Sequence, residues 1–192
     1  MRAITFDIEA ISPTAVRGRV NVDEMELTVV GIHDSSTGEY SSFFKDELPK
    51  LWPIIESSDM LIGFNSDTFD IPLLNRYYPG DLTKMRSLDI LAEVHKVLGR
   101  RIRLDSLAQA TLNHGKSGDG LKAMVWWQEG KYDLVKKYCI EDVRLTRELY
   151  DFARANGHLK YKDLNQKKDV KLDTSAWESE GTGHALTHTL GI

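Results

Sequence analysis

Alternating apolar and polar positions at residues 3–9 predict a β-strand, because successive side chains of a strand point to opposite faces. Segments rich in β-favouring residues follow at 26–33 and 40–44, and a short apolar run at 60–64 has the length of a buried strand. Between the third and fourth of these strands, residues 46–56 carry apolar side chains at helical spacing. The chain is therefore expected to begin with a three-stranded meander, a helix and a fourth strand.

After Thr68 the apolar positions recur mainly at helical spacing. We predict helices at residues 68–78, 89–98, 105–113, 120–128 and 132–155. The glycine-dense stretch 115–120 is expected to be a loop, and it lacks the Gly-x4-Gly-Lys-Ser/Thr spacing of a phosphate-binding P-loop. Strands followed mostly by helices are typical of a mixed α/β fold in which helices cover a β-sheet.

The length of 192 residues suits one domain with an extension. We predict the main domain over residues 1–157 and a basic C-terminal extension and tail over 158–192, because the chain is polar and lysine-rich after Gly157. A terminal hairpin is expected within 158–174. No run approaches the about 18 apolar residues of a membrane span, and an acid interrupts the start too early for a secretory signal. We therefore expect an intracellular, cytoplasmic protein without membrane contact.

The charge is distributed unevenly along the chain, although the net charge is only −4. Residues 1–96 hold 9 Lys and Arg against 16 Asp and Glu, whereas the remaining residues hold 16 against 13. This asymmetry reflects either chance clustering of solvated charges or an acidic, metal-collecting pole beside a basic, phosphate-facing one. The single cysteine, Cys139, excludes an internal disulfide and a thiolate metal cluster, and we expect it to be a small buried residue.

Asp7 and Glu9 are two positions apart in the first predicted strand. Their carboxylates therefore project from the same face, about 7 Å apart along the chain. Hard divalent cations take oxygen ligands, so such a pair is able to hold one. An acid pair at a strand end also occurs as plain surface decoration or as the start of a turn.

Two further segments carry acids in suggestive positions. Asp70 lies in the first turn of a predicted helix, after the sequence Gly-Phe-Asn-Ser-Asp-Thr-Phe, where it could equally complete a capping arrangement. Tyr138 and Asp142 are four positions apart in the last predicted helix and share a face, so the phenol could hold a water at an ion that the carboxylate binds. The simpler alternative is a core tyrosine and a surface acid.

Taken together, three motifs resemble in order and spacing those of the DEDD superfamily of ribonuclease H-like 3′–5′ exonucleases: Phe6-Asp7-Ile8-Glu9, Asn65 with Phe69-Asp70, and Tyr138 with Asp142. The tyrosine branch (DEDDy) is the one that the chain resembles, because the histidine branch places a histidine where Lys137 stands. The motif forms look most like the proofreading domain of family B DNA polymerases. The resemblance spans roughly residues 1–155 and implies a ribonuclease H-like mixed β-sheet flanked by helices.

This resemblance implies a site for two divalent ions, Mg²⁺ or Mn²⁺, held by four carboxylates. Asp7 would bridge both ions, while Glu9 and Asp142 would complete the site of the ion that activates water. Asp70 would serve the second ion, and Tyr138 would orient the attacking hydroxide.

The resemblance also suggests substrate-binding residues. Asn65 and Phe69 match positions that hold the terminal nucleotide in the family, and Lys116 follows a predicted helix much as a lysine does in polymerase relatives. Ordinary turn, core and surface roles are the alternatives for these three. Further candidates for phosphate contact or base stacking are Arg100, Arg101, Arg103, Lys122, Trp126 and Trp127. Ordinary surface charge and core packing are the alternatives for these residues.

The expected function is a metal-dependent 3′–5′ exonuclease that acts on single-stranded DNA and releases nucleoside 5′-monophosphates. RNA 3′ ends, a ribonuclease H-like endonuclease activity and a noncatalytic nucleic-acid-binding scaffold are the alternatives. The absence of a strongly basic sequence is compatible with a protein partner that delivers the substrate.

Overall fold

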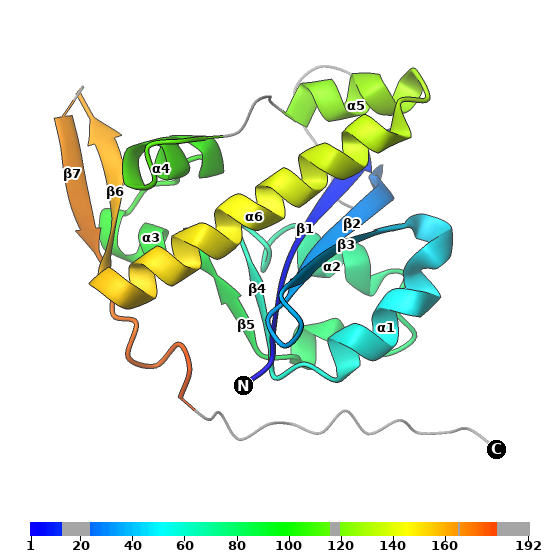
Figure 1. Cartoon of the computed structure of the whole chain (residues 1–192), viewed down its shortest axis with the longest axis horizontal. Helices are drawn as coiled ribbons and strands as arrows, with labels where there is room; N and C mark the ends of the chain where they lie inside the picture. Colours follow the sequence, from blue (N-terminus) through cyan, green and yellow to red (C-terminus); the bar gives the residue numbers. More distant parts are fainter. Residues whose placement is uncertain (13–23, 116–119, 165, 180–192) are drawn as a thin grey trace.

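A five-stranded mixed β-sheet forms the centre of the protein, with strand order β3-β2-β1-β4-β5 (Figure 1). The computed structural model describes residues 1–12, 24–115, 120–164 and 166–179. The strands of this sheet are β1 (Ala3–Ile11), β2 (Glu26–Asp34), β3 (Glu39–Phe44), β4 (Met60–Gly63) and β5 (Ser87–Asp89). The first three strands pair antiparallel, and β4 and β5 add to the other side of β1 in parallel. The predicted meander and the ribonuclease H-like mixed sheet are confirmed.

Helices cover the sheet, as predicted. They are α1 (Leu48–Glu56), α2 (Asp70–Asn75), α3 (Ile90–Leu98), α4 (Leu104–Thr111), α5 (Gly120–Gln128) and α6 (Tyr132–Asn156), with short 3₁₀ turns at Lys45–Glu47 and Leu82–Lys84. The 25-residue α6 runs diagonally across one face of the sheet in Figure 1. It ends at Gly157, whose left-handed backbone (φ 69°) closes the last turn through a hydrogen bond to Ala153. Within the described part of the chain, no helix has the length and apolar character that crossing a bilayer requires.

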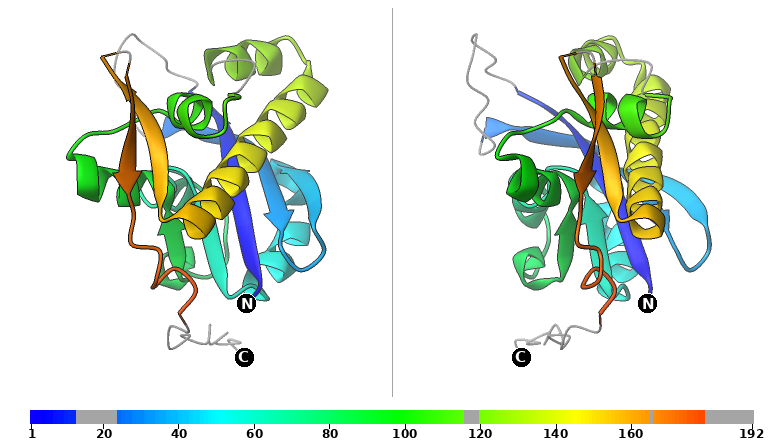
Figure 2. Two further views of the ribbon diagram at one scale, coloured as in Figure 1. Left: turned by 60° about the vertical axis from the view of Figure 1, so that its left-hand side comes forward. Right: turned by 90° about the vertical axis from the view of Figure 1, so that its left-hand side faces the viewer.

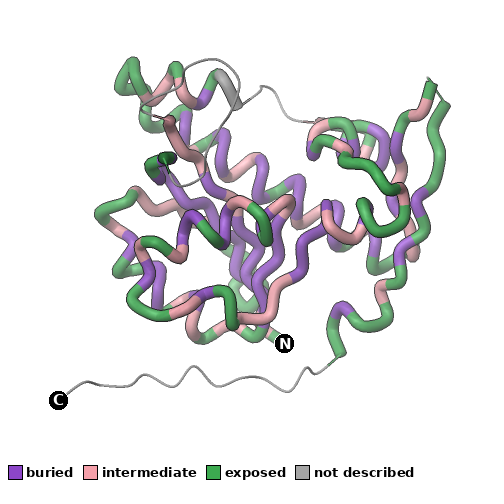
Figure 3. The backbone as a smooth tube through the Cα atoms, turned by 180° about the vertical axis from the view of Figure 1, so that it is seen from behind, coloured by how far each residue is buried: buried purple, intermediate pink, exposed green. Residues whose placement is uncertain are grey.

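Side-chain alternation along β1 divides the core into two layers. Ala3 packs with residues of α6 such as Leu145 and Leu149, whereas Ile4 and Phe6 pack with residues of α1 and α2 on the opposite face. Buried positions accordingly concentrate in the central strands and on the inner side of the helices (Figure 3). The odd-numbered positions of β1, which include Asp7 and Glu9, therefore face α6.

A second sheet, the hairpin of β6 (His158–Asp163) and β7 (Gln166–Lys171), follows α6 and lies beside α3 and α4 (Figure 2). Its apolar residues Leu159 and Val170 belong to the same buried cluster as the residues of α4 and α6, and Trp177 stacks on Tyr150 at 5.7 Å between ring centroids. The predicted terminal hairpin is thus confirmed, and it packs into the main core. Of the predicted tail, residues 180–192 lie outside the described residues.

Two segments differ from the sequence-based expectation. The predicted helix at 68–78 is shorter, because Phe69 has φ −131° and ψ −66° and the regular helix spans only Asp70–Asn75. Residues 87–89 form a strand that was not predicted, since three residues are too few to show a period of two. That strand pairs with β4, and its last residue, Asp89, caps α3.

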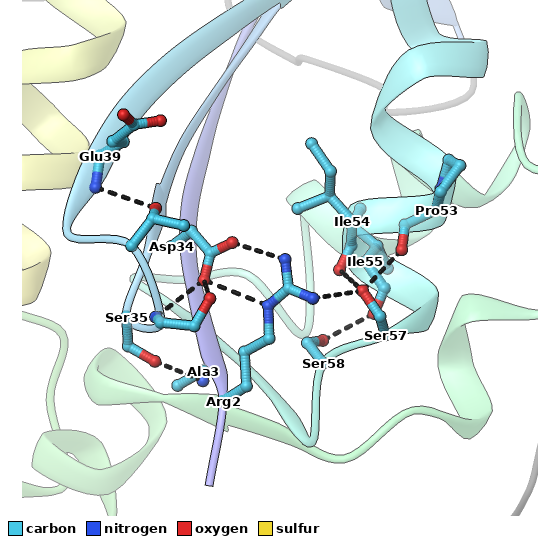
Figure 4. Close-up of polar contacts among 12 residues, drawn as sticks. Arg2, Ala3, Asp34, Ser35, Glu39, Pro53, Ile54, Ile55, Ser57 and Ser58 are labelled. Carbon is cyan, nitrogen blue, oxygen red and sulfur yellow. Dashed lines mark hydrogen bonds and ion pairs between the residues drawn. The ribbon is translucent and has the colours of Figure 1, made fainter.

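An ion pair joins three elements at the end of the sheet where β1 begins (Figure 4). The guanidinium of Arg2 donates to both carboxylate oxygens of Asp34 at 3.2 and 2.6 Å and to the hydroxyl of Ser57 at 2.5 Å. The Arg2 guanidinium and the hydrogen bonds from Ser36 lower the pKa of Asp34 to about 2. This network ties β1 to the end of β2 and to the C-terminus of α1.

Candidate active site

Asp7 and Glu9 lie in the half of β1 that extends past β4, and they face α6. A carboxylate oxygen of each and the Sγ atom of Cys139 all lie within 4.8 Å of one another. The Cys139 thiol donates to the backbone carbonyl of Asp7 at 3.4 Å. Close carboxylates repel one another unless a cation or a proton neutralises them, so this arrangement favours cation binding.

Asp70 reaches the same strand from the start of α2. Strand β4 pairs with β1 only as far as Thr5, and beyond that point the backbone N–H of Ile8 donates to Oδ1 of Asp70 at 3.1 Å. The carboxyl group is 4% exposed. Burial, together with the charges of Asp89 and Asp142, raises the pKa of Asp70 to about 7. Asp70 is thus a carboxyl group that a nearby cation would ionise at neutral pH.

Tyr138 and Asp142 are both buried on α6, one turn apart, on the side that faces β1. The ring of Trp126 from α5 packs edge-on against Tyr138, with ring centroids 6.1 Å apart. Burial and the charges of Asp7, Glu9 and Asp142 raise the pKa of the intervening Cys139 thiol. Cys139 is therefore a buried neutral thiol, as expected, and three carboxylates lie near it.

A cavity of about 320 Å³ opens onto Asp7 and Asp142, whereas Glu9, Asp70 and Tyr138 are not among its lining residues. Its walls come from β1, the turn after β4, the segment that joins α3 to α4, and α6; its polar lining residues are Asp7, Asn65, Arg101, Arg103, Asp105 and Asp142. Two arginines thus stand in the same cavity as two of the carboxylates. Such a cavity offers both cation ligands and phosphate-binding cations.

Asn65 lines the cavity from a tight turn. A Cβ atom on Gly63 would lie 2.3 Å from the Cβ of Ser66, so the turn closes only over a glycine. Asn65 itself has φ 68°, a left-handed conformation that asparagine tolerates. Its side-chain oxygen accepts hydrogen bonds from the hydroxyl of Thr68 at 2.7 Å and from the guanidinium of Arg101. Asn65 and Arg101 are therefore held together at the mouth of the site.

The other predicted substrate residues have different positions. Phe69 is half-buried, packs against the core cluster of α1 and α2, and is not part of the cavity wall. Lys116 lies outside the described residues. Arg101 and Arg103, which the sequence indicated only as two of several surface cations, both line the cavity.

Sequence reasoning missed two acids at this site. Asp105 lines the cavity from the first turn of α4, and no motif marked it. Asp89 caps α3, because its carboxylate accepts from the N–H groups of Leu91 and Ala92 at 2.9 and 3.2 Å. It also accepts from the N–H groups of Asn65 and Asp67 at 2.8 and 3.2 Å, and so it holds the turn that carries Asn65. The signal for this second role was the proximity of two turns in space, which spacing along the chain does not reveal.

The donor set fits a hard divalent cation. Asp7, Glu9, Asp70 and Asp142 offer only carboxylate oxygens, which Mg²⁺ and Mn²⁺ prefer. The one sulfur at the site is a neutral thiol and so a poor ligand. These four residues come from three separate segments of the chain: Asp7 and Glu9 project from β1 toward α6, Asp142 lies on α6, and Asp70 reaches the edge of β1 from α2.

Comparisons with known proteins agree with this fold. Residues 4–154 match the family model of the RNase_H superfamily. The chain is 28% identical over 203 aligned positions to DNA polymerase 1 of Aeropyrum pernix, which covers 78% of this chain and 20% of the polymerase. It also superimposes on the family B DNA polymerase of the hyperthermophilic archaeon Pyrobaculum calidifontis with a TM-score of 0.62 at 19% identity, over 80% of this chain and 24% of that one.

The chain thus spans about a fifth of the length of the polymerase relative that it matches in sequence. Superfamily membership and this similarity support nuclease activity. The matched region contains the strand, the turn and the helix that supply Asp7, Asp70 and Asp142. This chain belongs to the RNase H superfamily.

Proposed function

We propose that this chain is a metal-dependent 3′–5′ exonuclease that hydrolyses phosphodiester bonds at the 3′ end of single-stranded DNA and releases nucleoside 5′-monophosphates. The observation that carries the proposal is the clustering of four acids: Asp7 and Glu9 lie together on β1, Asp70 accepts from Ile8 of the same strand, and Asp142 is close enough to Asp70 to help raise its pKa. Tyr138 lies one helical turn from Asp142. Similarity to a DNA polymerase favours DNA over RNA as the substrate.

Asp7, Glu9, Asp70 and Asp142 would hold two divalent ions, Mg²⁺ or Mn²⁺. When bound, such ions supply activation of water and stabilisation of the leaving 3′ oxygen. The protein excludes bulk water around Asp70 and Asp142, which strengthens electrostatic interactions there. Tyr138, whose ring packs against Trp126, would orient the attacking water through its phenol.

Arg101 and Arg103 are the groups suited to the substrate backbone. Both line the cavity beside the acids, where their guanidinium groups can bind nonbridging phosphate oxygens. The hydrogen bond between Arg101 and Asn65 orients one of the two. A cavity of about 320 Å³ is at the small end of the range for ligand sites, which favours a single terminal nucleotide over a continuous duplex.

The test is digestion of a 5′-labelled single-stranded DNA oligonucleotide with Mg²⁺ or Mn²⁺. We expect a ladder of shortened products that disappears in EDTA, and a loss of rate of at least about 100-fold in Asp7→Asn, since two-metal catalysis contributes several kcal/mol. Asp81→Asn is the matched control, because this exposed aspartate caps a turn away from the cavity.

Each alternative has its own outcome in the same experiment. Faster cleavage of a matched RNA strand would move the substrate from DNA to RNA. Cleavage of a circular single strand would replace exonuclease with endonuclease activity. Binding of DNA in Mn²⁺ without any product would leave a noncatalytic scaffold.

A further inference from the structure

A larger cavity, of about 680 Å³, shares no lining residue with the acidic one. Five aromatic side chains dominate its walls: Phe44, Trp52, Tyr77, Trp127 and Tyr132. They come from the end of β3, from α1, from the turn after α2, and from the ends of α5 and α6 that adjoin each other. We call this cavity the aromatic pocket; its volume lies within the range of about 300–1,000 Å³ usual for ligand sites.

Three of these rings hold one another in place. Trp127 and Tyr132 have centroids 4.7 Å apart, and Phe44 contacts both edge-on at 6.2 and 6.1 Å. Tyr132 is nevertheless 46% exposed, and Phe44 and Trp127 are only partly buried. Preorganised aromatic faces that solvent can reach are the usual platform for stacking an unpaired nucleobase.

Cations accompany the rings. The ammonium of Lys136 lies 3.9 Å from the centroid of Phe44, and that of Lys45 lies 5.3 Å from the centroid of Tyr77. In the part of the chain that the structure describes, no salt bridge joins either lysine to a carboxylate, although Asp46 lines the pocket and Lys136 interacts electrostatically with Glu47. Positive charge beside aromatic faces complements a ligand that is both anionic and aromatic, which single-stranded nucleic acid is.

Adjacent tryptophans connect the aromatic pocket to the acidic site. Trp126 packs on Tyr138, whereas Trp127 lines the aromatic pocket. Trp126, Trp127 and Phe44 pack together against a buried group that includes Cys139, whose sulfur lies beside Asp7 and Glu9. The two cavities are therefore linked through one packed cluster of side chains, and a single strand of several nucleotides is the kind of ligand that could occupy both.

We propose that the aromatic pocket is a second subsite for single-stranded nucleic acid, in which an unpaired base stacks on Trp127 and Tyr132 while Lys45 and Lys136 contact neighbouring phosphates. The inference rests on the proposed nuclease function and extends it: the strand whose 3′ end enters the acidic site also occupies this pocket. A protein segment is the rival occupant, and the two lysines beside the rings favour a polyanion over an apolar peptide.

The test compares binding of fluorescein-labelled dT12 and dT3 by the whole chain in EDTA, where no cleavage occurs. Stacking contributes about 1–3 kcal/mol per base, so Trp127→Leu should weaken dT12 binding by about 5-fold or more and leave dT3 unchanged. Lys136→Gln should also weaken dT12 binding and reduce its salt dependence by about one counterion. Lys84→Gln is the matched control, because Lys84 is an exposed lysine paired with Asp81.

Thermal unfolding of each variant shows whether it is folded, and Lys136→Gln keeps the test open should Trp127→Leu fail to fold. Unchanged dT12 affinity in folded Trp127→Leu or Lys136→Gln would overturn the second subsite. The proposed function would still stand in that case, provided that the wild type gives the digestion ladder. Loss of binding to an apolar dye in Trp127→Leu without loss of dT12 binding would also overturn it, in favour of a protein occupant. Absence of both dT12 binding and digestion in the wild type would overturn both proposals.

Discussion

The backbone N–H of Ile8 donates to the carboxylate of Asp70 at 3.1 Å, although 62 positions separate the two residues. The bond joins the start of α2 to the part of β1 that carries Asp7 and Glu9. It continues the hydrogen bonding of β1 beyond the point where β4 turns away. One carboxyl group therefore both continues the hydrogen bonding at the edge of β1 and lies among the acids of the proposed metal site.

Burial of this carboxyl group beside other acids makes the stability of the metal-free protein depend on pH. The pKa of Asp70 is about 7 in the folded protein, above its ordinary value of 3.8, so the folded state binds this proton more tightly than the unfolded state. The stabilisation is fully present below about pH 4 and is lost as pH rises to about 7. Melting temperatures in EDTA should accordingly fall between pH 5 and pH 8, more in the wild type than in Asp70→Asn, whose amide oxygen still accepts from Ile8.

A divalent ion should reverse this loss. At pH 8, millimolar Mn²⁺ should raise the melting temperature of the wild type, because it binds the folded acids, and it should raise that of Asp70→Asn less. Asp81→Asn should respond like the wild type. A melting temperature that Mn²⁺ leaves unmoved in the wild type would contradict the metal site itself.

Asp89 should be the most sensitive non-catalytic acid. It accepts four backbone N–H groups, two from α3 and two from the turn that carries Asn65. We expect Asp89→Ala to lower the free energy of unfolding by at least about 2 kcal/mol, because it leaves backbone N–H donors without an acceptor at two places. Urea titration measures this loss, and Asp81→Ala, which removes a cap from an exposed turn, should cost less than half as much.

Gly31 controls how closely β2 approaches α6. A Cβ atom there would lie 2.9 Å from the sulfur of Cys139 and 3.1 Å from a methyl group of Val143. Gly31→Ala should therefore cost about 1–3 kcal/mol through overpacking, and Cys139→Ala in the same chain should recover part of that cost. Additive effects of the two substitutions in urea unfolding would show that the sulfur is not what Gly31 accommodates.

The ion pair of Arg2 and Asp34 should stabilise the fold without affecting catalysis. The lowered pKa of Asp34, about 2, means that its contribution is present above about pH 4 and is lost as pH falls toward 2. Asp34→Asn should cost about 1–2 kcal/mol at pH 7, less near pH 2, because a charge-assisted hydrogen bond contributes this order of energy. Its digestion rate at 25 °C should match the wild type, since Figure 4 places the pair at the start of β1.

The local pattern of apolar and polar residues was sufficient to predict most helices and strands of this fold. The alternation at residues 3–9 and the helical spacing at 132–155 predicted β1 and α6, and both formed within a few residues of the expected ends. Each is long enough for its period to show. The strand at 87–89 was not predictable in this way, because its pairing with β4 and not its own pattern makes it a strand.

At the acidic site, the sequence by itself determined which face each group occupies: a period of two put Asp7 and Glu9 on one side of β1, and a spacing of four put Tyr138 and Asp142 on one side of α6. It did not determine that these faces meet. Their meeting depends on α6 crossing the sheet. It also depends on β4 pairing with β1 only as far as Thr5, because the N–H of Ile8 then donates to Asp70. The aromatic pocket, likewise, exists only because five separate segments lie beside one another, and contacts between distant segments depend on packing that no local pattern encodes.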